Sequence, residues 1–178
     1  MAVIMPIHYA RWRGLWSRSA LSVDNLRRVR TQAENDVRTM KRVQVNDPVA
    51  IRETGLRHHC DGNYTSALPY LTKAAGLGDE VAHFNLSVMY EYGQGVEKDK
   101  KKQIHHLEEA AIGGYFKARH SLGNEEFKDG RIERAVKHWI IAASSGDDYA
   151  IETISRGHAA GFVSREDCAA ALLAPGCC

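Results

Sequence analysis

The sequence predicts an all-α fold, a solenoid with two helices in each of about three repeats and capping helices beside them. The pattern Ala-Ala-x-x-Gly occurs three times and ends at Gly78, Gly114 and Gly146, which lie 36 and 32 residues apart. Self-similarity with a period in this range is typical of solenoid proteins. The 178 residues also include only four Pro and few β-rich runs, which argues against an all-β fold.

Two further positions recur at a fixed distance from each final glycine. Four residues after it lies an alanine and eight residues after it a large aliphatic residue, in the pairs Ala82 and Leu86, Ala118 and Leu122, Ala150 and Ile154. An earlier copy fits the same frame with Ala50 and Thr54. Small residues let helices approach closely, and larger apolar residues fill the gaps between them. Because one helix pair cannot bury its apolar face alone, stacking of the repeats is expected to form the core.

The frame predicts the helix boundaries. We expect helices over residues 48–59, 64–76, 80–91, 100–112, 116–127, 132–144 and 148–158, and a closing helix over 165–174. The segment Ser164-Arg165-Glu166-Asp167 is a capping-box pattern before the closing helix, on which Cys168 is expected in the core. The final glycine of each repeat lies where a helix must end, in the left-handed conformation of a C-cap. Pro69 is expected to shift the start of its helix or to leave a kink.

Composition excludes several classes of protein. The formal net charge is only +2, so no excess of charge over the whole chain points to nucleic acid or membrane. No run of 18 apolar residues exists, and a transmembrane helix is therefore not expected. The four cysteines are too few and too scattered for a disulfide scaffold, which favours a reducing compartment, the cytoplasm or the nucleus.

The N-terminal segment differs in charge from the remainder. Residues 1–47 carry a net charge of +5 and the remainder −3, and the change falls at Pro48, where a new helix can begin. Residues 1–23 contain no acid and form a basic leader. Its composition is similar to that of an organellar transit peptide, although a disordered leader or a misassigned start site would give the same composition.

The sequence of residues 24–47 predicts an amphipathic helix. Its apolar residues recur at spacings of three and four, and they are Leu26, Val29, Ala33, Val37, Met40 and Val43. The other face carries Arg27, Arg28, Arg30, Arg38, Lys41 and Arg42. We favour a capping helix with a solvated basic face, and contact with an anionic partner or a membrane surface is the alternative.

The best-kept copy of the repeat lies between Val81 and Gly114. Its first part, His83-Phe84-Asn85-Leu86-Ser87-Val88-Met89-Tyr90-Glu91-Tyr92-Gly93-Gln94-Gly95-Val96-Glu97-Lys98-Asp99, resembles the Sel1-like repeat, a relative of the tetratricopeptide repeat. The resemblance covers about residues 48–160, the expected repeat array, and leaves residues 161–178 as a capping helix and tail. It implies a right-handed, tetratricopeptide-like superhelix of antiparallel helix pairs. Some relatives place a RING-like zinc module before such repeats, but here no cysteine precedes Cys60.

No metal, cofactor or catalytic site is expected. Neighbouring residues on a helix point about 100° apart, so His58-His59-Cys60 and His105-His106 cannot chelate one ion together. Packing within the repeat explains His106 and His138, which stand where the first copy has Tyr70. Gly93-Gln94-Gly95 is the turn inside a repeat and follows no strand, as a dinucleotide site would require. Cys177-Cys178 carries no prenylation signal and is interpreted as the end of a flexible tail.

The expected function is protein binding in a groove. In tetratricopeptide-like stacks the first helix of each pair lines the concave face, and this resemblance places groove residues two before, two after and five after each core aliphatic residue. They are Arg52, Leu56, His59, Phe84, Val88, Glu91, His120, Asn124, Phe127, Glu152 and Arg156. This mixture of apolar, aromatic and polar groups suits a peptide or an extended protein segment.

The sequence therefore predicts a non-catalytic adaptor or scaffold without a cofactor or small-molecule substrate. Two alternatives are nucleic-acid or membrane-surface binding through the basic N-terminal segment, and a ubiquitin-pathway adaptor related to RING-linked repeat proteins.

Overall fold

The computed structural model describes residues 23–172, in which every secondary-structure element is an α-helix. It divides into two units between Val45 and Asn46. The first unit contributes α1 (Val23–Gln44), whose described apolar side chains include Val37, 58% exposed, and Met40, 46% exposed. Leu26, Val29 and Arg28, which the sequence places on the two faces of this helix, have side chains outside the described set, as do the leader and the Cys177-Cys178 tail.

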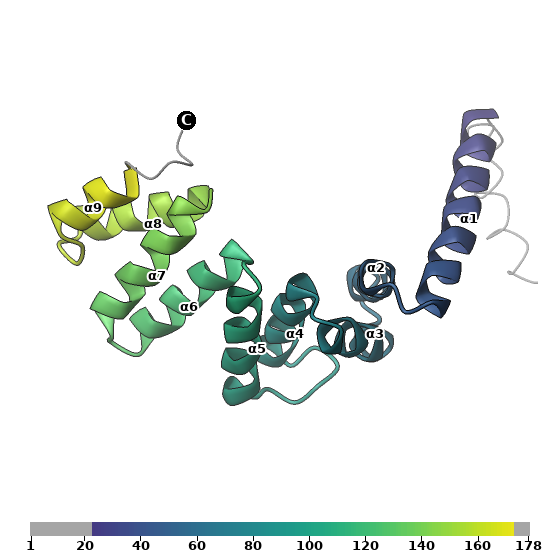
Figure 1. Ribbon diagram of the computed structural model, residues 1–178, viewed down its shortest axis with the longest axis horizontal. Helices are drawn as coiled ribbons and strands as arrows, with labels where there is room; N and C mark the ends of the chain where they lie inside the picture. The colour runs from purple at the N-terminus through teal and green to yellow at the C-terminus, as the bar shows by residue number, and fades with distance from the viewer. Residues whose placement is uncertain (1–22, 173–178) are drawn as a thin grey trace, which may run out of the picture. The chain divides into compact units, whose positions relative to one another are not determined.

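The second unit is a stack of helix pairs (Figure 1). Its helices are α2 (Pro48–Cys60), α3 (Tyr64–Gly76), α4 (Glu80–Tyr92), α5 (Lys100–Ile112), α6 (Phe116–Lys128), α7 (Ile132–Ser144), α8 (Asp148–Ala159) and α9 (Arg165–Leu172). Helix α2 packs on α3, α4 on α5 and α6 on α7, and each pair contacts the next through α3 with α4 and α5 with α6. Helix α9 packs on both α7 and α8 and closes the stack. The predicted solenoid of helix pairs is confirmed.

Side chains and glycines set the helix ends. The carboxylates of Asp47, Asp79, Asp99 and Asp147 each accept hydrogen bonds from backbone N–H groups in the first turn of α2, α4, α5 and α8. Such caps satisfy amide groups that have no partner within the helix. Gly78, Gly114 and Gly146 adopt φ of 86°, 92° and 89°, which confirms that the final residue of each repeat pattern is left-handed. The predicted capping box also forms, because Ser164 Oγ accepts from the Asp167 N–H at 3.0 Å.

Small and large residues alternate in the core as the frame predicts. The recurring alanines, Ala50, Ala82, Ala118 and Ala150, are each fully buried. Leu86, Leu122 and Ile154 are buried beside them, and Thr54 is buried in the first repeat with Oγ donating to the Ala50 carbonyl at 2.9 Å. Cys168 is partly buried and packs against the last core cluster.

The residue after the core position must be small in the first and third repeats, where it is Gly55 and Gly123. A Cβ built on Gly123 would lie 2.5 Å from Cδ1 and Nε1 of Trp139, and one built on Gly55 would lie 2.9 Å from Cγ of Leu71. The two helices of a pair therefore touch at this point, with the large residue of the second helix seated against the backbone of the first. The close approach explains the glycine at this place in the first and third repeats.

Helix α3 continues through Pro69 from Tyr64 to Gly76, so its start does not shift. Proline has no N–H to donate to the carbonyl four residues before it, here that of Thr65. Both residues are exposed, which leaves that carbonyl on the solvent side of the helix.

Candidate functional site

The predicted groove residues lie on the first helices of successive pairs, α2, α4, α6 and α8, and none of them is buried. The partly exposed ones are Arg52, Leu56, His59, Phe84, Val88, Glu91, His120 and Asn124, and the exposed ones are Phe127, Glu152 and Arg156. Their positions follow from the helical period, because residues two before, two after and five after the core aliphatic flank the buried face.

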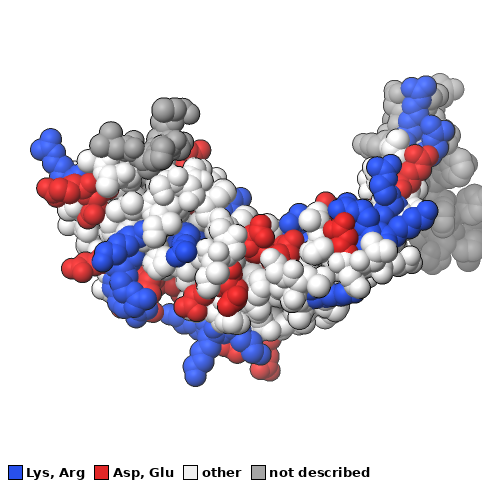
Figure 2. All heavy atoms as spheres, viewed as in Figure 1, with Lys and Arg blue, Asp and Glu red and all other residues white. Residues whose placement is uncertain are grey.

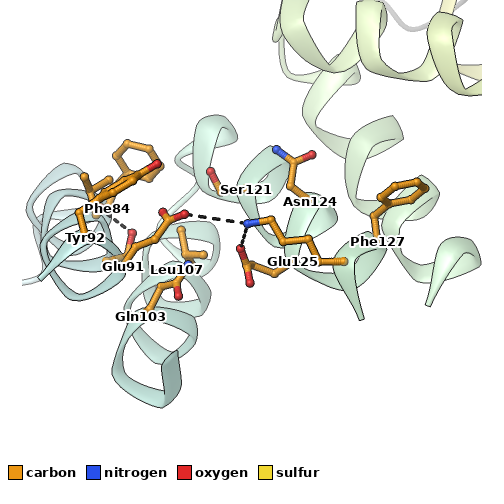
Figure 3. A pocket seen from close by; sticks show the side chains of 12 residues that line it. Phe84, Glu91, Tyr92, Gln103, Leu107, Ser121, Asn124, Glu125 and Phe127 are labelled. Atoms are coloured by element: carbon orange, nitrogen blue, oxygen red, sulfur yellow. Dashed lines mark hydrogen bonds and ion pairs between the residues drawn. The ribbon is translucent and has the colours of Figure 1, made fainter. Parts of the chain in front are cut away.

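Five of these residues meet at one cavity of about 460 Å³ between α4, α5 and α6 (Figure 3). They are Phe84, Val88 and Glu91 from α4 and Asn124 and Phe127 from α6. The remaining lining comes from Ser87, Tyr92, Gln103, Leu107, Ser121, Glu125 and Lys128. A cavity of this size accommodates one or two side chains of a bound segment.

The charged groups of the cavity form a chain. Glu125 is buried, and Lys128 Nζ donates to its Oε1 at 2.6 Å, while Lys100 Nζ lies 3.6 Å from its Oε2. Lys128 Nζ also lies 3.9 Å from Oε1 of Glu91 across the cavity (Figure 3). The hydrogen bond to Glu125 raises the pKa of Lys128, so the ammonium stays charged.

Asn124 is held in one orientation by a neighbouring helix. Trp139 Nε1 on α7 donates to Asn124 Oδ1 at 3.1 Å, and this bond assigns the oxygen of the amide to the tryptophan side. Beside it, the Phe127 ring lies 5.7 Å from the ring of Trp139 and 5.8 Å from that of Phe162, between centroids. Phe127 is nevertheless 39% exposed. One wall of the cavity is therefore fixed by the last repeat.

Several predicted groove residues also make contacts between repeats that the sequence did not indicate. Arg52 Nη1 donates to Asp79 Oδ2 at 2.9 Å, the Phe84 ring lies 5.1 Å from that of Tyr115, and His120 Nδ1 lies 3.5 Å from Asp147 Oδ2. Elsewhere His59 Nε2 is hydrogen-bonded to Gln94 Oε1 at 2.8 Å. These side chains therefore help to hold neighbouring repeats together, and only part of their surface is available to a ligand.

Seven lining residues were absent from the predicted site: Ser87, Tyr92, Gln103, Leu107, Ser121, Glu125 and Lys128. The frame contained a signal for one of them, since Gln103 stands where the other repeats have Ala67 and Ala135. The cavity is also lined by side chains of α5, the second helix of its pair. The prediction missed these residues because it placed groove residues only on the first helix of each pair.

The histidines of α4 and α5 pack on aromatic and polar neighbours. His106 stacks on Tyr90 with ring centroids 5.6 Å apart, and its Nδ1 lies 3.0 Å from Nδ1 of His83. Burial, followed by the nearby His83, lowers the pKa of His106 to about 4. His58 stacks on Tyr70 in the preceding repeat in the same way. Within residues 23–172, no group of three or more His, Cys, Asp or Glu side chains is arranged to hold a metal ion.

Comparison with known proteins gives a family and a fold. A family model described as the Sel1 repeat matches residues 50–79, 81–115 and 119–147. The solved structure of a Sel1 repeat protein from Oxalobacter formigenes is similar with a TM-score of 0.65 and 24% identity, over 74% of this chain and 58% of that one. A comparison with curated proteins finds no match.

A second solved structure, a protective antigen present in uropathogenic Escherichia coli strains and displaying an SLR fold, is similar with a TM-score of 0.65 and 24% identity. The alignment covers 75% of this chain and 32% of that one, so the chain spans about a third of the antigen's length. Both structures support the solenoid fold. None of the described helices is both long and apolar enough to cross a membrane.

Proposed function

Because the chain belongs to the Sel1 repeat family, whose members are generally protein-interaction scaffolds, we propose that it is a non-catalytic adaptor that binds an extended protein segment along its first helices. The observation that carries the proposal is the cavity between α4, α5 and α6, where side chains of two successive repeats converge. A segment seated there would contact both repeats at once, as an extended ligand of a solenoid must.

The composition of the cavity supports a protein ligand. Phe84, Val88 and Phe127 offer apolar surface, while Ser121 and Asn124 offer hydrogen-bonding groups. Interfaces of this mixed kind anchor a partner through a few aromatic or aliphatic contacts and orient it through polar ones. We extend the groove along the stack to Arg52, Leu56 and His59 on one side and to Glu152 and Arg156 on the other.

A blocking substitution tests the proposal. Val88→Arg places a long charged side chain in the cavity, whereas Leu77→Arg makes the same kind of change at an exposed apolar residue in a turn outside it. Full-length protein and both variants are used to capture partners from lysate, with quantitative mass spectrometry. Partners retained by Leu77→Arg and lost by Val88→Arg support the groove.

Partners that survive Val88→Arg and fall away steeply with added salt would instead favour binding of nucleic acid or an anionic membrane through the basic N-terminal segment, because many phosphate contacts give a steep salt dependence. Retention of a ubiquitin-pathway protein by the groove would identify the adaptor's pathway. We propose the cytoplasm or nucleus as its compartment, because four scattered cysteines suit a reducing environment, and organellar targeting through the basic leader is the alternative.

A further inference from the structure

Two buried polar side chains stand at positions where other repeats have buried apolar residues, and both line the same cavity. Gln103 occupies the position of Ala67 and Ala135, which are fully buried alanines. Glu125 lies three residues after its core leucine, where the preceding repeat has the fully buried Met89. Burying a polar group costs free energy unless it is well paired, and Glu125 has its cationic partners at the surface, so packing of the core alone does not favour these exchanges. Their shared location indicates a binding requirement at the cavity.

The acidic groups of the cavity already hold a cation from the chain itself. Lys128 Nζ lies between Glu125 Oε1, at 2.6 Å, and Glu91 Oε1, at 3.9 Å (Figure 3). The contact with Glu91 is long, and more than half of the Lys128 side chain is exposed. Lys128 is also the last residue of α6, so its flexible stem can carry the ammonium away from the cavity into solvent.

We propose that this cavity receives an arginine or lysine side chain of the bound segment, which takes the place of the Lys128 ammonium between Glu91 and Glu125. The proposal rests on the function proposed above and names the chemistry of the partner: a segment with one basic residue between aliphatic residues. Lys100 stays near Glu125, so that carboxylate is already partly neutralised when the incoming cation arrives. Among the described residues, Glu91 has only the long contact with Lys128 and can form a full ion pair with the incoming cation.

The walls of the cavity fit such a side chain. Phe84 and Tyr92 stand on the α4 side and Phe127 on the α6 side, with Gln103 and Leu107 between them (Figure 3). Aromatic faces stabilise the aliphatic stem and the charged group of arginine or lysine through apolar and cation–π contacts. Figure 2 also shows acidic side chains gathered near the middle of the array on the face in view.

The main chain of the segment would bind beside the basic residue. Because Trp139 occupies Oδ1 of Asn124, the amide NH₂ of Asn124 remains available as a donor. A donor on an exposed helix face beside the cavity suits a backbone carbonyl of an extended chain.

The test uses the full chain and blocked peptides Ala-Leu-Arg-Leu-Ala and Ala-Leu-Gln-Leu-Ala, titrated by NMR with the Trp139 indole N–H as reporter. We expect the arginine peptide to bind at the cavity and the glutamine peptide to bind at least about threefold more weakly. Glu91→Gln should weaken the arginine peptide about three- to tenfold. Lys128→Met should strengthen it, because the internal competitor is removed.

Matched controls lie on exposed residues of α5 outside the cavity, Glu108→Gln for the acid and Lys101→Met for the lysine, and neither should change the affinity. Equal binding of both peptides at the cavity would overturn the basic-residue proposal and leave groove binding intact. Absence of peptide binding, or weaker binding by a folded Lys128→Met variant, would overturn it as well. Failure of the adaptor function appears separately, as partners retained by Val88→Arg.

Discussion

Arg52 and Asp79 join the first two repeats: Nη1 of Arg52 donates to Oδ2 of Asp79 at 2.9 Å, and Asp79 also caps α4 by accepting from the Ala82 N–H at 2.8 Å. Arg52, two residues before the buried Thr54, thus reaches the cap of the next first helix. Phe84 and Tyr115 make the equivalent contact one repeat later, ring to ring. An aspartate cap is met by a cationic side chain, and an aromatic cap is met by an aromatic side chain.

Removal of the arginine should destabilise the array. Arg52→Ala leaves the carboxylate of Asp79 buried without its cationic donor, and hydrogen bonds to charged groups contribute roughly 1.5–3 kcal/mol. We expect the free energy of unfolding, measured in urea, to decrease by an amount within that range. Arg156→Ala is the control, since Arg156 is largely exposed and lies 3.9 Å from Glu152; the change should cost less than about 0.5 kcal/mol. Equal losses for the two variants would contradict a structural role for the Arg52–Asp79 pair.

Alanine substitutions at two glycines should change the stability of the array in opposite directions. Gly123→Ala would place a Cβ 2.5 Å from the indole of Trp139 and 3.0 Å from the Ala135 carbonyl, so the α6–α7 pair must separate. Overpacking of this kind typically costs about 1–3 kcal/mol. At Gly76, by contrast, a Cβ meets nothing within 4 Å, and alanine in the helix should stabilise by about 0.5–1 kcal/mol. Thermal melts of both variants measure the difference, and equal melting temperatures would show that the close approach at Trp139 is not required.

The helix boundaries were predictable because local signals mark them. Pro48 and the aspartate caps begin helices, and glycines in the left-handed conformation follow their ends, so each expected boundary in residues 48–159 lies within one residue of the observed one. The closing helix is described only to Leu172, where residues 165–174 were expected.

Contacts between repeats were not predictable in the same way. The pairing of Arg52 with Asp79 depends on the angle and distance between neighbouring first helices, which no spacing within one repeat encodes. The carboxylate of Glu125 is buried because Lys100 and Lys128 reach it from two helices. A repeat pattern defined by its apolar residues predicts that a charged residue such as Glu125 faces solvent. Only Gln103, which stands where two other repeats have alanine, indicated a polar cavity.

Acid should destabilise the fold through its histidines. Burial lowers the pKa of His106 to about 4, and burial also lowers those of His120 and His138. Between pH 6.5 and about 4 the unfolded chain therefore binds protons that the folded chain excludes, so the stabilising contribution is full above pH 6.5 and is lost as the pH falls. Urea unfolding across this range should show the decline.

His106→Tyr isolates one of these contributions. Tyrosine stands at this place in the first repeat, as Tyr70, where it stacks on His58. The variant should lose less stability than the native chain between neutral pH and pH about 4.5, because one group that the fold keeps neutral has been removed. An identical pH dependence in the two proteins would show that His106 does not titrate differently in the folded and unfolded states.

The array should fold without the N-terminal segment. Its helices pack on one another in sequence from α2 to α9, and Asp47 caps α2 by accepting from the N–H groups of Val49 and Ala50. A fragment of residues 45–178 should therefore give a strongly helical circular dichroism spectrum and melt cooperatively. A spectrum of a disordered chain at neutral pH would instead make residues 1–44 part of the folding unit.

The assignment of inner and outer faces can be tested with two substitutions on one helix. Ala118 on α6 is fully buried against Leu107, Ala110 and Leu122, so Ala118→Leu forces a larger side chain between packed helices and should cost about 3 kcal/mol. Phe127→Ala removes an exposed ring that touches Trp139 and Phe162, and the lost aromatic contacts should cost about 1 kcal/mol.

The control for added volume is Ala169→Leu on the exposed face of α9, which should leave stability nearly unchanged. Urea unfolding of the three variants gives the order of the losses. If Phe127→Ala were the most damaging and Ala118→Leu were tolerated, Phe127 would be a core residue. The cavity would then lose Phe127 from its α6 wall, and the assignment of outer faces on which the adaptor function and the basic-residue site depend would be contradicted.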